Sequence, residues 1–319
     1  MWPMPRFLVT GAHGCIGAWV THELVTAGLP VTTFDVSREG RRLRLLLGEE
    51  TLSAVPHVVG DITDLASLER ALDEHGTTNI IHLAALQVPF CRADPPLGAR
   101  VNVVGTVNVL EAAKRRRDSM APVVYASSVA ALAPDGGLAG NPSTLYGGYK
   151  RANEASAAVY FADEGVSSIG LRPHTVYGVG RDQGLTSAPT VAMLAAAAGA
   201  PYTIPYGGAA QVQLARDVAR ALIGASLSGF EGAAVHSLPS PVTPIEGVVA
   251  AITAAAPGCS VRCEGQPLPF PERAGTDSFA EIVPDYVETP LHEGIADTIE
   301  RFRALLSQGL VDAPVSSRP

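Results

Sequence analysis

Short runs of apolar and β-branched residues alternate with longer amphipathic stretches through the first half of the chain. The apolar runs predict β-strands at 7–10, 31–34, 58–59, 79–83, 123–126 and 168–171, and the amphipathic stretches predict helices at 15–27, 65–75, 102–116 and 148–164. Strands and helices in this order form a parallel sheet that is covered by helices on both faces. The pattern therefore predicts an α/β fold with a Rossmann-type doubly wound parallel sheet, whose ligands bind at the carboxyl ends of the strands.

The alternation loosens after about residue 177, where proline and glycine become frequent. We expect a Rossmann domain over 1–178 with a return segment at about 208–239. The remaining segments, 179–207 and 240–319, predict a smaller, discontinuous C-terminal lobe that binds the substrate.

The overall charge limits the classes of partner. The 319 residues carry 23 basic and 31 acidic side chains, for a net charge of −8. Nucleic acids and anionic membrane surfaces attract basic patches, so we expect neither as a partner. The longest apolar stretch, at about 190–200, is rich in alanine and ends at Gly199 and Pro201, so it predicts no membrane span.

The cysteine pattern and the amino-terminal pattern bear on the compartment. The cysteines at positions 15, 91, 259 and 263 show no disulfide or zinc spacing, and no signal-peptide pattern precedes the first strand. We therefore expect reduced thiols, no metal site and a cytoplasmic protein.

A glycine-rich loop follows the first predicted strand and opens the first helix. Glycines are needed where the backbone turns tightly and where a pyrophosphate approaches the amides at a helix N-terminus. An ordinary strand–helix turn is the alternative interpretation, but the position of the loop favours a dinucleotide. The loop residues expected to bind it are Gly11, Gly14, Cys15, Ile16 and Gly17.

Asp35 ends the second predicted strand, 24 residues after Gly11. A carboxylate at this place accepts hydrogen bonds from the ribose hydroxyls and repels a 2′-phosphate, which favours NAD over NADP. Arg38 is the counter-argument, because a guanidinium binds such a phosphate. Asp35 lies nearer the strand end, so we expect NAD.

Tyr146 and Lys150 lie four residues apart at the start of a predicted helix and share one face. A tyrosine phenol has a pKa of about 10, and a neighbouring ammonium together with a positive nicotinamide ring would stabilise its phenolate. Lys150 is one of only two lysines among 23 basic residues, and an arginine cannot replace a compact ammonium without changing the geometry. The pair therefore predicts a general base, with a surface tyrosine packed on a helix as the alternative.

Ser127 and Ser128 follow the strand at 123–126. A serine at the carboxyl end of this strand can hydrogen-bond the substrate oxygen and orient it toward Tyr146. The alternative is that both serines only cap the next segment. We favour Ser128 as the catalytic serine.

Further motifs appear in order along the chain. They are Gly60-Asp61-Ile62, His82-Leu83-Ala84-Ala85, Asn102 within 101–106, Leu171-Arg172-Pro173 before Val176-Tyr177-Gly178, and Arg216–Arg220. With the glycine loop, Ser128, Tyr146 and Lys150, this set resembles the extended short-chain dehydrogenases, the NAD-dependent epimerase/dehydratase family. The likeness covers about residues 6–225, and a weaker similarity is found at 289–295.

The resemblance implies roles for individual residues. Ser128, Tyr146 and Lys150 become the catalytic set, and Tyr146 and Lys150 also contact the cofactor. Asp61 and Ile62 flank the adenine, and Asn102 lies near the nicotinamide. The cofactor groove is lined by Leu83, Ala84 and Ala85, and the segment from Pro173 to Val176 passes the nicotinamide and the substrate. The family often pairs through the helices at 102–116 and 148–164, which implies a homodimer.

Several reaction types remain open within this family. Dehydratases carry an acid pair after the catalytic hydroxyl, whereas Val129 and Ala130 follow Ser128 here, so dehydration is not expected. A dehydrogenase releases its ketone product, and an epimerase returns the hydride to a transient keto intermediate. The catalytic residues serve both routes equally. A non-catalytic NAD-sensing protein is a further alternative, although such proteins tend to lose the tyrosine and lysine.

The substrate expectation rests on departures from the family. Nucleotide-sugar epimerases place an asparagine where Thr175 stands, next to His174, and an arginine at the position of Ala210; both bind phosphate. Arg273 weakly resembles a second phosphate-binding arginine. We expect a smaller polyhydroxy substrate, such as a sugar, sugar acid or hydroxy acid, bound in part by Ser128, His174 and Thr175. A small keto product leaves more easily, which favours the dehydrogenase over the epimerase.

Overall fold

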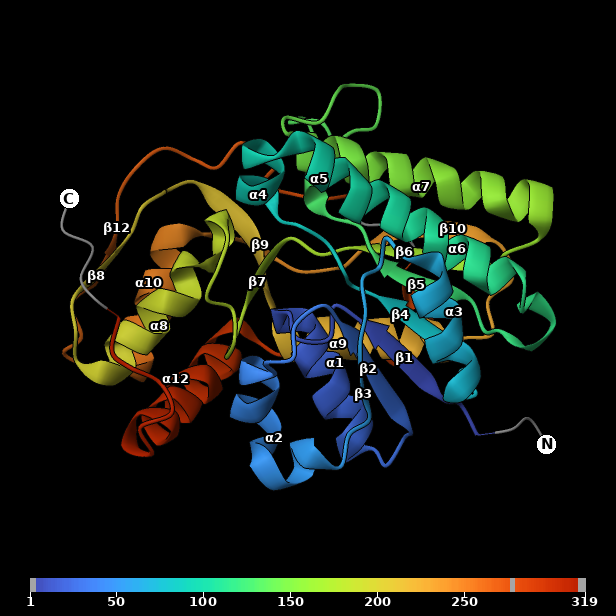
Figure 1. Ribbon diagram of the computed structural model, residues 1–319. Helices are drawn as coiled ribbons and strands as arrows, with labels where there is room; N and C mark the ends of the chain where they lie inside the picture. Colours follow the sequence, from blue (N-terminus) through green and yellow to red (C-terminus); the bar gives the residue numbers. More distant parts are fainter. Residues whose placement is uncertain (1–3, 276–278, 315–319) are drawn as a thin grey trace.

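The computed structural model describes residues 4–275 and 279–314. Its largest sheet has seven parallel strands in the order β10-β6-β5-β4-β1-β2-β3 (Figure 1). These strands are β1 (Phe7–Thr10), β2 (Val31–Asp35), β3 (His57–Val59), β4 (Asn79–His82), β5 (Val123–Ala126), β6 (Ser168–Arg172) and β10 (Ala233–Ser237). The order reverses at β1, which has β2 on one side and β4 on the other. This topology confirms the predicted doubly wound fold.

Helices cover both faces of this sheet because successive strand residues point to opposite sides. Leu8 and Ile80 face a core formed with α3 (Leu65–Glu74), α6 (Gly105–Lys114) and α7 (Leu145–Glu164). Val9 and Ile81 face the other core, formed with α1 (Cys15–Thr26) and α9 (Ala215–Leu227). Continuous apolar strands of this kind are expected in a sheet that is buried on both faces.

A smaller group of elements lies at the left of Figure 1. The strand β9 (Ala209–Leu214) pairs with β7 (Thr175–Tyr177) and β11 (Val242–Pro244), while β8 (Tyr202–Ile204) pairs with β12 (Val261–Cys263). The helices of this group are α8 (Ala188–Ala198), α10 (Ile245–Ala255) and α12 (Leu291–Ser307). The helices α2 (Arg41–Ser53), α4 (Val88–Ala93), α5 (Pro95–Ala99) and α11 (Phe279–Ile282) complete the fold.

The return segment expected at about 208–239 contains α9, which packs on α1, and β10, which joins the large sheet. The segments 179–207 and 240–319 contribute α8, α10 and α12. The division into two domains remains a proposal.

Several elements differ from the pattern-based expectation. The helix α2 was not predicted, and Gly48 interrupts it with a φ of +73°. The helix expected over 102–116 begins as a π-turn over Arg100–Val104 and continues as α6. The helix expected from residue 148 starts at Leu145, because the Thr144 side chain accepts a hydrogen bond from the Gly147 amide.

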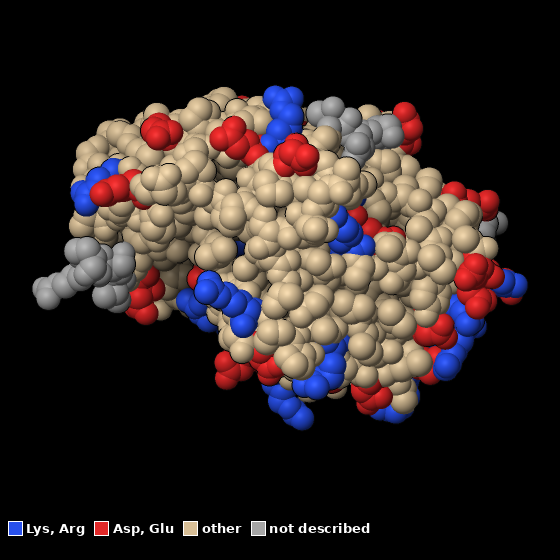
Figure 2. Space-filling view, turned by 90° about the horizontal axis from the view of Figure 1, so that it is seen from above, with Lys and Arg blue, Asp and Glu red and all other residues tan. Residues whose placement is uncertain are grey.

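The surface carries charges of both signs. On the face shown in Figure 2, most basic side chains lie beside acidic ones, without a broad patch of one sign. Over the described parts of the chain, no helix combines the length and the apolar character that a membrane crossing requires.

Candidate functional site

The glycine loop packs so closely that side chains are excluded. Gly11 has a φ of +66°, and a Cβ there would lie 2.6 Å from the Ala84 amide nitrogen. A Cβ on Gly17 would lie 2.3 Å from the Gly11 carbonyl oxygen. The first turn of α1 is therefore pressed against the end of β1. Its orphan amides face a pocket lined by all five predicted loop residues, Gly11, Gly14, Cys15, Ile16 and Gly17.

Asp35 is fixed next to this loop. One carboxylate oxygen accepts a hydrogen bond from the His13 amide at 3.0 Å, and the other from the Ser37 amide at 3.1 Å. The Gly60 amide donates to the Asp35 carbonyl at 3.0 Å, which brings Asp61 and Ile62 beside the end of β2. These acidic residues lie outside the pocket lining, at the end where the adenosine is expected.

Asp61 and Ile62 have different surroundings. Asp61 is exposed, and its carboxylate accepts hydrogen bonds from the amide and hydroxyl of Thr63. Ile62 is buried, and a Cβ on Gly105 would lie 2.8 Å from its methyl group. Ile62 is therefore part of the wall between β3 and α6, and its contact with an adenine stays a prediction.

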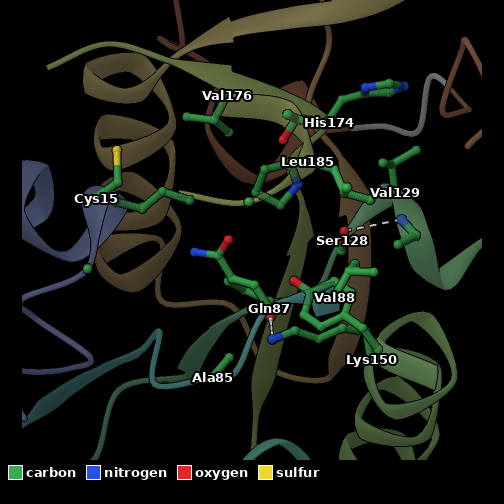
Figure 3. A pocket seen from close by; sticks show the side chains of 18 of the residues that line it. Cys15, Ala85, Gln87, Val88, Ser128, Val129, Lys150, His174, Val176 and Leu185 are labelled. Atoms are coloured by element: carbon green, nitrogen blue, oxygen red, sulfur yellow. Dashed lines mark hydrogen bonds between the residues drawn. The ribbon is translucent and has the colours of Figure 1, made fainter. Parts of the chain in front are cut away.

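The three predicted catalytic residues converge on one pocket at the carboxyl ends of β4, β5 and β6. Ser128 comes from the turn after β5, whereas Tyr146 and Lys150 come from the first turns of α7. The Ser128 hydroxyl accepts a hydrogen bond from the Ala130 amide at 3.1 Å and lies near enough to the Tyr146 phenol to influence its pKa. The Lys150 ammonium lies 5.6 Å from the centre of the Tyr146 ring and donates to the Ala126 carbonyl at 2.6 Å (Figure 3).

Burial governs the electrostatics of this group. It raises the pKa of Tyr146, and the nearby Ser128 hydroxyl opposes the rise. Burial also lowers the pKa of Lys150 to about 8. The Lys150 ammonium donates to a backbone carbonyl and also lies over the Tyr146 ring. The stabilisation of a Tyr146 phenolate by Lys150 together with a nicotinamide ring stays a prediction.

Buried polar groups hold the pocket from behind. His82, whose pKa burial lowers to about 3, bridges the hydroxyl groups of Thr10 and Thr106 at 2.8 and 3.1 Å. The Thr10 hydroxyl also accepts hydrogen bonds from the amides of Leu83 and Ala84. A neutral His82 therefore fixes the segment that passes the glycine loop, in which Leu83 and Ala85 line the pocket and Ala84 packs on Gly11.

Asn102 has a supporting position rather than one in the pocket lining. It is 1% exposed, and its side-chain nitrogen donates to the carbonyls of Leu86 and Gly98 at 3.2 and 3.0 Å. It therefore ties the segment after β4 to the π-turn before α6. Its proximity to a nicotinamide stays a prediction.

A second buried network lies behind the catalytic residues. Arg172 donates two hydrogen bonds of 2.8 Å to the Glu154 carboxylate, which also accepts one from the Ser127 hydroxyl. Glu154 lies one helical turn after Lys150. The network joins β5, β6 and α7 and engages the hydroxyl of Ser127, which lines the pocket together with Ser128.

The predicted residues after β6 all line the pocket, namely Pro173, His174, Thr175 and Val176. The His174 ring is occupied, since Nε2 lies 2.7 Å from the Pro271 carbonyl and Nδ1 lies 3.2 Å from the Thr175 hydroxyl. Thr175 is only 1% exposed. His174 thus binds the backbone at Pro271 and holds the adjacent Phe270, whose side chain also lines the pocket.

Sequence reasoning missed several lining residues. The segment after β4 adds Gln87, Val88 and Pro89, and the loop after β7 adds Arg181, Gly184, Leu185 and Thr186. Gln87, Ser128 and Lys150 all line the pocket, and Figure 3 shows Cys15 at its left edge. The closely spaced glycines at 178, 180 and 184, around Arg181, were the available signal for a sharply turning loop at the site.

A profile of the NAD dependent epimerase/dehydratase family matches residues 7–234. The chain belongs to this family. The match confirms the predicted family, whose description names NAD as the cofactor. The pocket fits that cofactor, because the glycine loop leaves no space for side chains where the pyrophosphate would meet the amides of α1.

Relatives of known sequence include sugar-nucleotide epimerases. UDP-glucuronate 4-epimerase 2 of Arabidopsis thaliana is 32% identical over 182 residues, which are 54% of this chain and 42% of that protein. UDP-glucose 4-epimerase of Azospirillum brasilense is 33% identical over 181 residues, which are 54% of this chain and 50% of that protein. The chain thus spans about half the length of these curated relatives.

Solved structures resemble nearly the whole chain. The complex of Thermus thermophilus UDP-glucose 4-epimerase with NAD has a TM-score of 0.77 and 26% identity, covering 93% of this chain and 99% of that one. A partial consensus L-threonine 3-dehydrogenase has a TM-score of 0.80 at 23% identity, covering 94% of this chain and 100% of that one. The second likeness concerns the fold alone.

Proposed function

We propose that the protein is an NAD-dependent dehydrogenase that transfers a hydride between its cofactor and a secondary alcohol or ketone of a small polyhydroxy compound. The convergence of Ser128, Tyr146 and Lys150 on the pocket bounded by the glycine loop carries this proposal. Bound NAD would supply the hydride acceptor. Within the chain, Tyr146 accepts the proton of the substrate hydroxyl, and Ser128 holds that oxygen within reach. The Lys150 ammonium places a positive charge beside the Tyr146 ring.

The preference for a substrate without a nucleotide rests on the positions where nucleotide-sugar epimerases bind phosphate. Ala210 stands where those epimerases have the phosphate-binding arginine. The side chains of the two nearby glutamines, Gln211 and Gln213, form hydrogen bonds with backbone groups. Gln211 accepts from the Ala274 amide and donates to the Ser240 carbonyl, and Gln213 accepts from the His174 amide and donates to the Leu238 carbonyl. Arg273 is exposed and lies outside the pocket lining. These contacts support the smaller substrate.

An NAD-dependent epimerase is the second candidate. The relatives named above are 4-epimerases, and the same catalytic residues would return the hydride to a transient keto intermediate. A non-catalytic NAD sensor is the third candidate. It is disfavoured because such proteins tend to lose the tyrosine and lysine, and both Tyr146 and Lys150 are present.

A substrate panel distinguishes the three candidates. Purified protein is mixed with NAD and with polyols, sugars, sugar acids and hydroxy acids, the NADH absorbance is followed, and isomerised products are separated by chromatography. We expect NADH to accumulate with at least one compound. Isomerised product without NADH would establish the epimerase, and tight NAD binding without turnover would establish the sensor. Micromolar binding of UDP in calorimetry would overturn the substrate class.

Tyr146→Phe is the matched variant for this panel. It removes one hydroxyl and keeps the ring that packs beside Lys150, so we expect NAD affinity to remain within about twofold. Loss of a general base lowers a rate by about 10²- to 10⁴-fold. A variant that retains more than half of the wild-type activity would remove Tyr146 from the mechanism.

We further propose a homodimer that forms through α6 and α7. Val104, Val159 and Phe161, on or beside these helices, are large apolar side chains that are 45%, 56% and 38% exposed. Light scattering on the purified protein tests this, and a monomer at micromolar concentration would contradict it. The cytoplasmic location stays a prediction.

A further inference from the structure

The catalytic pocket has a surplus of positive charge. Among the described residues, its lining includes the cationic side chains of Lys150 and Arg181 but no aspartate or glutamate. Lys150 is 4% exposed, and its ammonium is directed at the Ala126 carbonyl. Arg181 is therefore the cation to consider for an incoming ligand.

The guanidinium of Arg181 lacks an anionic partner within the described chain. One of its terminal nitrogens donates to the Thr186 hydroxyl at 2.8 Å, whereas its Nε is buried without an acceptor. The neighbouring carboxylate, Asp182, is ion-paired with Arg41 and Arg42 of α2. A buried donor without an acceptor is unfavourable, so a ligand oxyanion that accepts this hydrogen would be favoured.

The local backbone brings two further polar groups to Arg181. Gly184 has a φ of +92°, and a Cβ there would lie 2.2 Å from the Gln87 side-chain oxygen and 3.4 Å from a terminal nitrogen of Arg181. The amide of Gln87, the guanidinium of Arg181 and the hydroxyl of Thr186 thus meet at one side of the pocket. In Figure 3, Gln87 and Leu185 lie next to each other, which shows that the loop after β7 reaches the segment after β4.

The position of Arg181 relates it to the reacting atoms. Its positive charge acts on the phenol of Tyr146 and also on the thiol of Cys15 at the start of α1. The guanidinium therefore shares the pocket with the catalytic tyrosine and with the first turn of α1 and is near enough to both to influence them. A carboxylate and a pyrophosphate are both oxyanions that a planar guanidinium binds through paired hydrogen bonds.

We propose that Arg181, assisted by Gln87 and Thr186, binds a carboxylate of the substrate. The substrate is then an acid, such as a sugar acid or a hydroxy acid, and its carboxylate holds the alcohol carbon beside Tyr146. This inference rests on the proposed function. The substrate is favoured over the pyrophosphate as the source of the oxyanion because the amides in the first turn of α1, which line the same pocket, would hold the pyrophosphate.

The test is calorimetry on protein saturated with NADH, so that binding is measured without turnover. The probes are acids and their neutral counterparts: D-galacturonate beside D-galactose, D-glucuronate beside D-glucose, and D-threonate beside D-threitol. We expect at least one acid to bind more tightly than its neutral counterpart. Arg181→Gln should lower the binding affinity for that acid by about 10- to 100-fold and leave the affinity for the neutral compound unchanged. Arg181→Lys should retain only part of the wild-type affinity for the acid.

Arg41→Gln is the matched control, because it removes a guanidinium that pairs with Asp182, the neighbour of Arg181 in the chain. The Arg41 side chain is 59% exposed and does not line the pocket. This variant should leave acid binding unchanged. NAD affinity is measured on all variants, and a loss of NAD affinity in Arg181→Gln with intact acid binding would assign the guanidinium to the pyrophosphate and overturn the proposal. Failure of every acid to bind would also overturn it.

Turnover separates this proposal from the proposed function. An enzyme that oxidises a neutral sugar and ignores all acids would refute the carboxylate site and keep the dehydrogenase. Acid binding that depends on Arg181, in a protein that turns over no compound, would keep the carboxylate site and refute the dehydrogenase.

Discussion

Replacing Lys150 with methionine should make the protein more stable while it abolishes turnover. The Lys150 side chain is 4% exposed, and burial lowers the pKa of its ammonium to about 8 from an ordinary value of 10.5. A lowering of this size means that the folded state gives up about 3 kcal/mol to keep the charge at neutral pH. Methionine has a similar length and carries no charge, so this cost disappears.

The variant also loses a favourable contact. The ammonium donates to the Ala126 carbonyl at 2.6 Å, and a buried carbonyl left without a donor costs about 1–3 kcal/mol. The net gain at pH 7 is therefore at most about 2 kcal/mol in the free energy of unfolding. For 319 residues this corresponds to a rise in Tm of at most about 3 °C.

The pH dependence identifies the cause. Between pH 8 and pH 10.5 the unfolded chain binds more protons at Lys150 than the folded chain does, so wild-type stability from this group rises with pH. The advantage of Lys150→Met over the wild type should accordingly shrink across this window. Urea unfolding followed by circular dichroism at pH 7, 8, 9 and 10 measures it.

The second lysine provides the control. Lys114 lies at the end of α6 with a 35% exposed side chain, so Lys114→Met should change the free energy of unfolding little at any of these pH values. A Lys150→Met protein that is less stable than the wild type at pH 7, or whose advantage does not change with pH, would refute the electrostatic argument.

Three further variants test the site. Asp35→Ser should narrow the preference for NAD over NADP in steady-state kinetics, and wild-type enzyme that uses NADP equally well would show that Arg38 governs the ribose site. Gly147→Ala should lose most activity and about 1–3 kcal/mol of stability, because its Cβ would lie 2.0 Å from the Ala130 carbonyl oxygen. Gly148→Ala, which meets nothing within 4 Å, is its control, and equal behaviour of the two would contradict this reasoning. Lys150→Arg should remain severely impaired despite its charge, which turnover and NAD titration would check.

The sequence alone was sufficient for the main sheet and for the core of the site. Six of the seven large-sheet strands follow from apolar runs, because a strand buried on both faces needs an apolar side chain at nearly every position. The glycine loop was predictable because only glycine fits where Gly11 and Gly17 approach neighbouring backbone. Ser128, Tyr146 and Lys150 follow from local spacing, since each lies directly at a strand end or in the first turns of one helix.

Other features depend on contacts between segments far apart in the chain. The helix α2 carries polar residues on most of its surface and buries only Leu43, so its apolar periodicity is weak. Arg181 and Gln87 are 94 positions apart and meet only because the loop after β7 folds over the segment after β4. The charge state of Lys150 is likewise a tertiary property, because burial, and not the neighbouring sequence, determines its pKa. The local pattern therefore specified the strands and the reacting groups, whereas packing between distant segments decided which charges surround them.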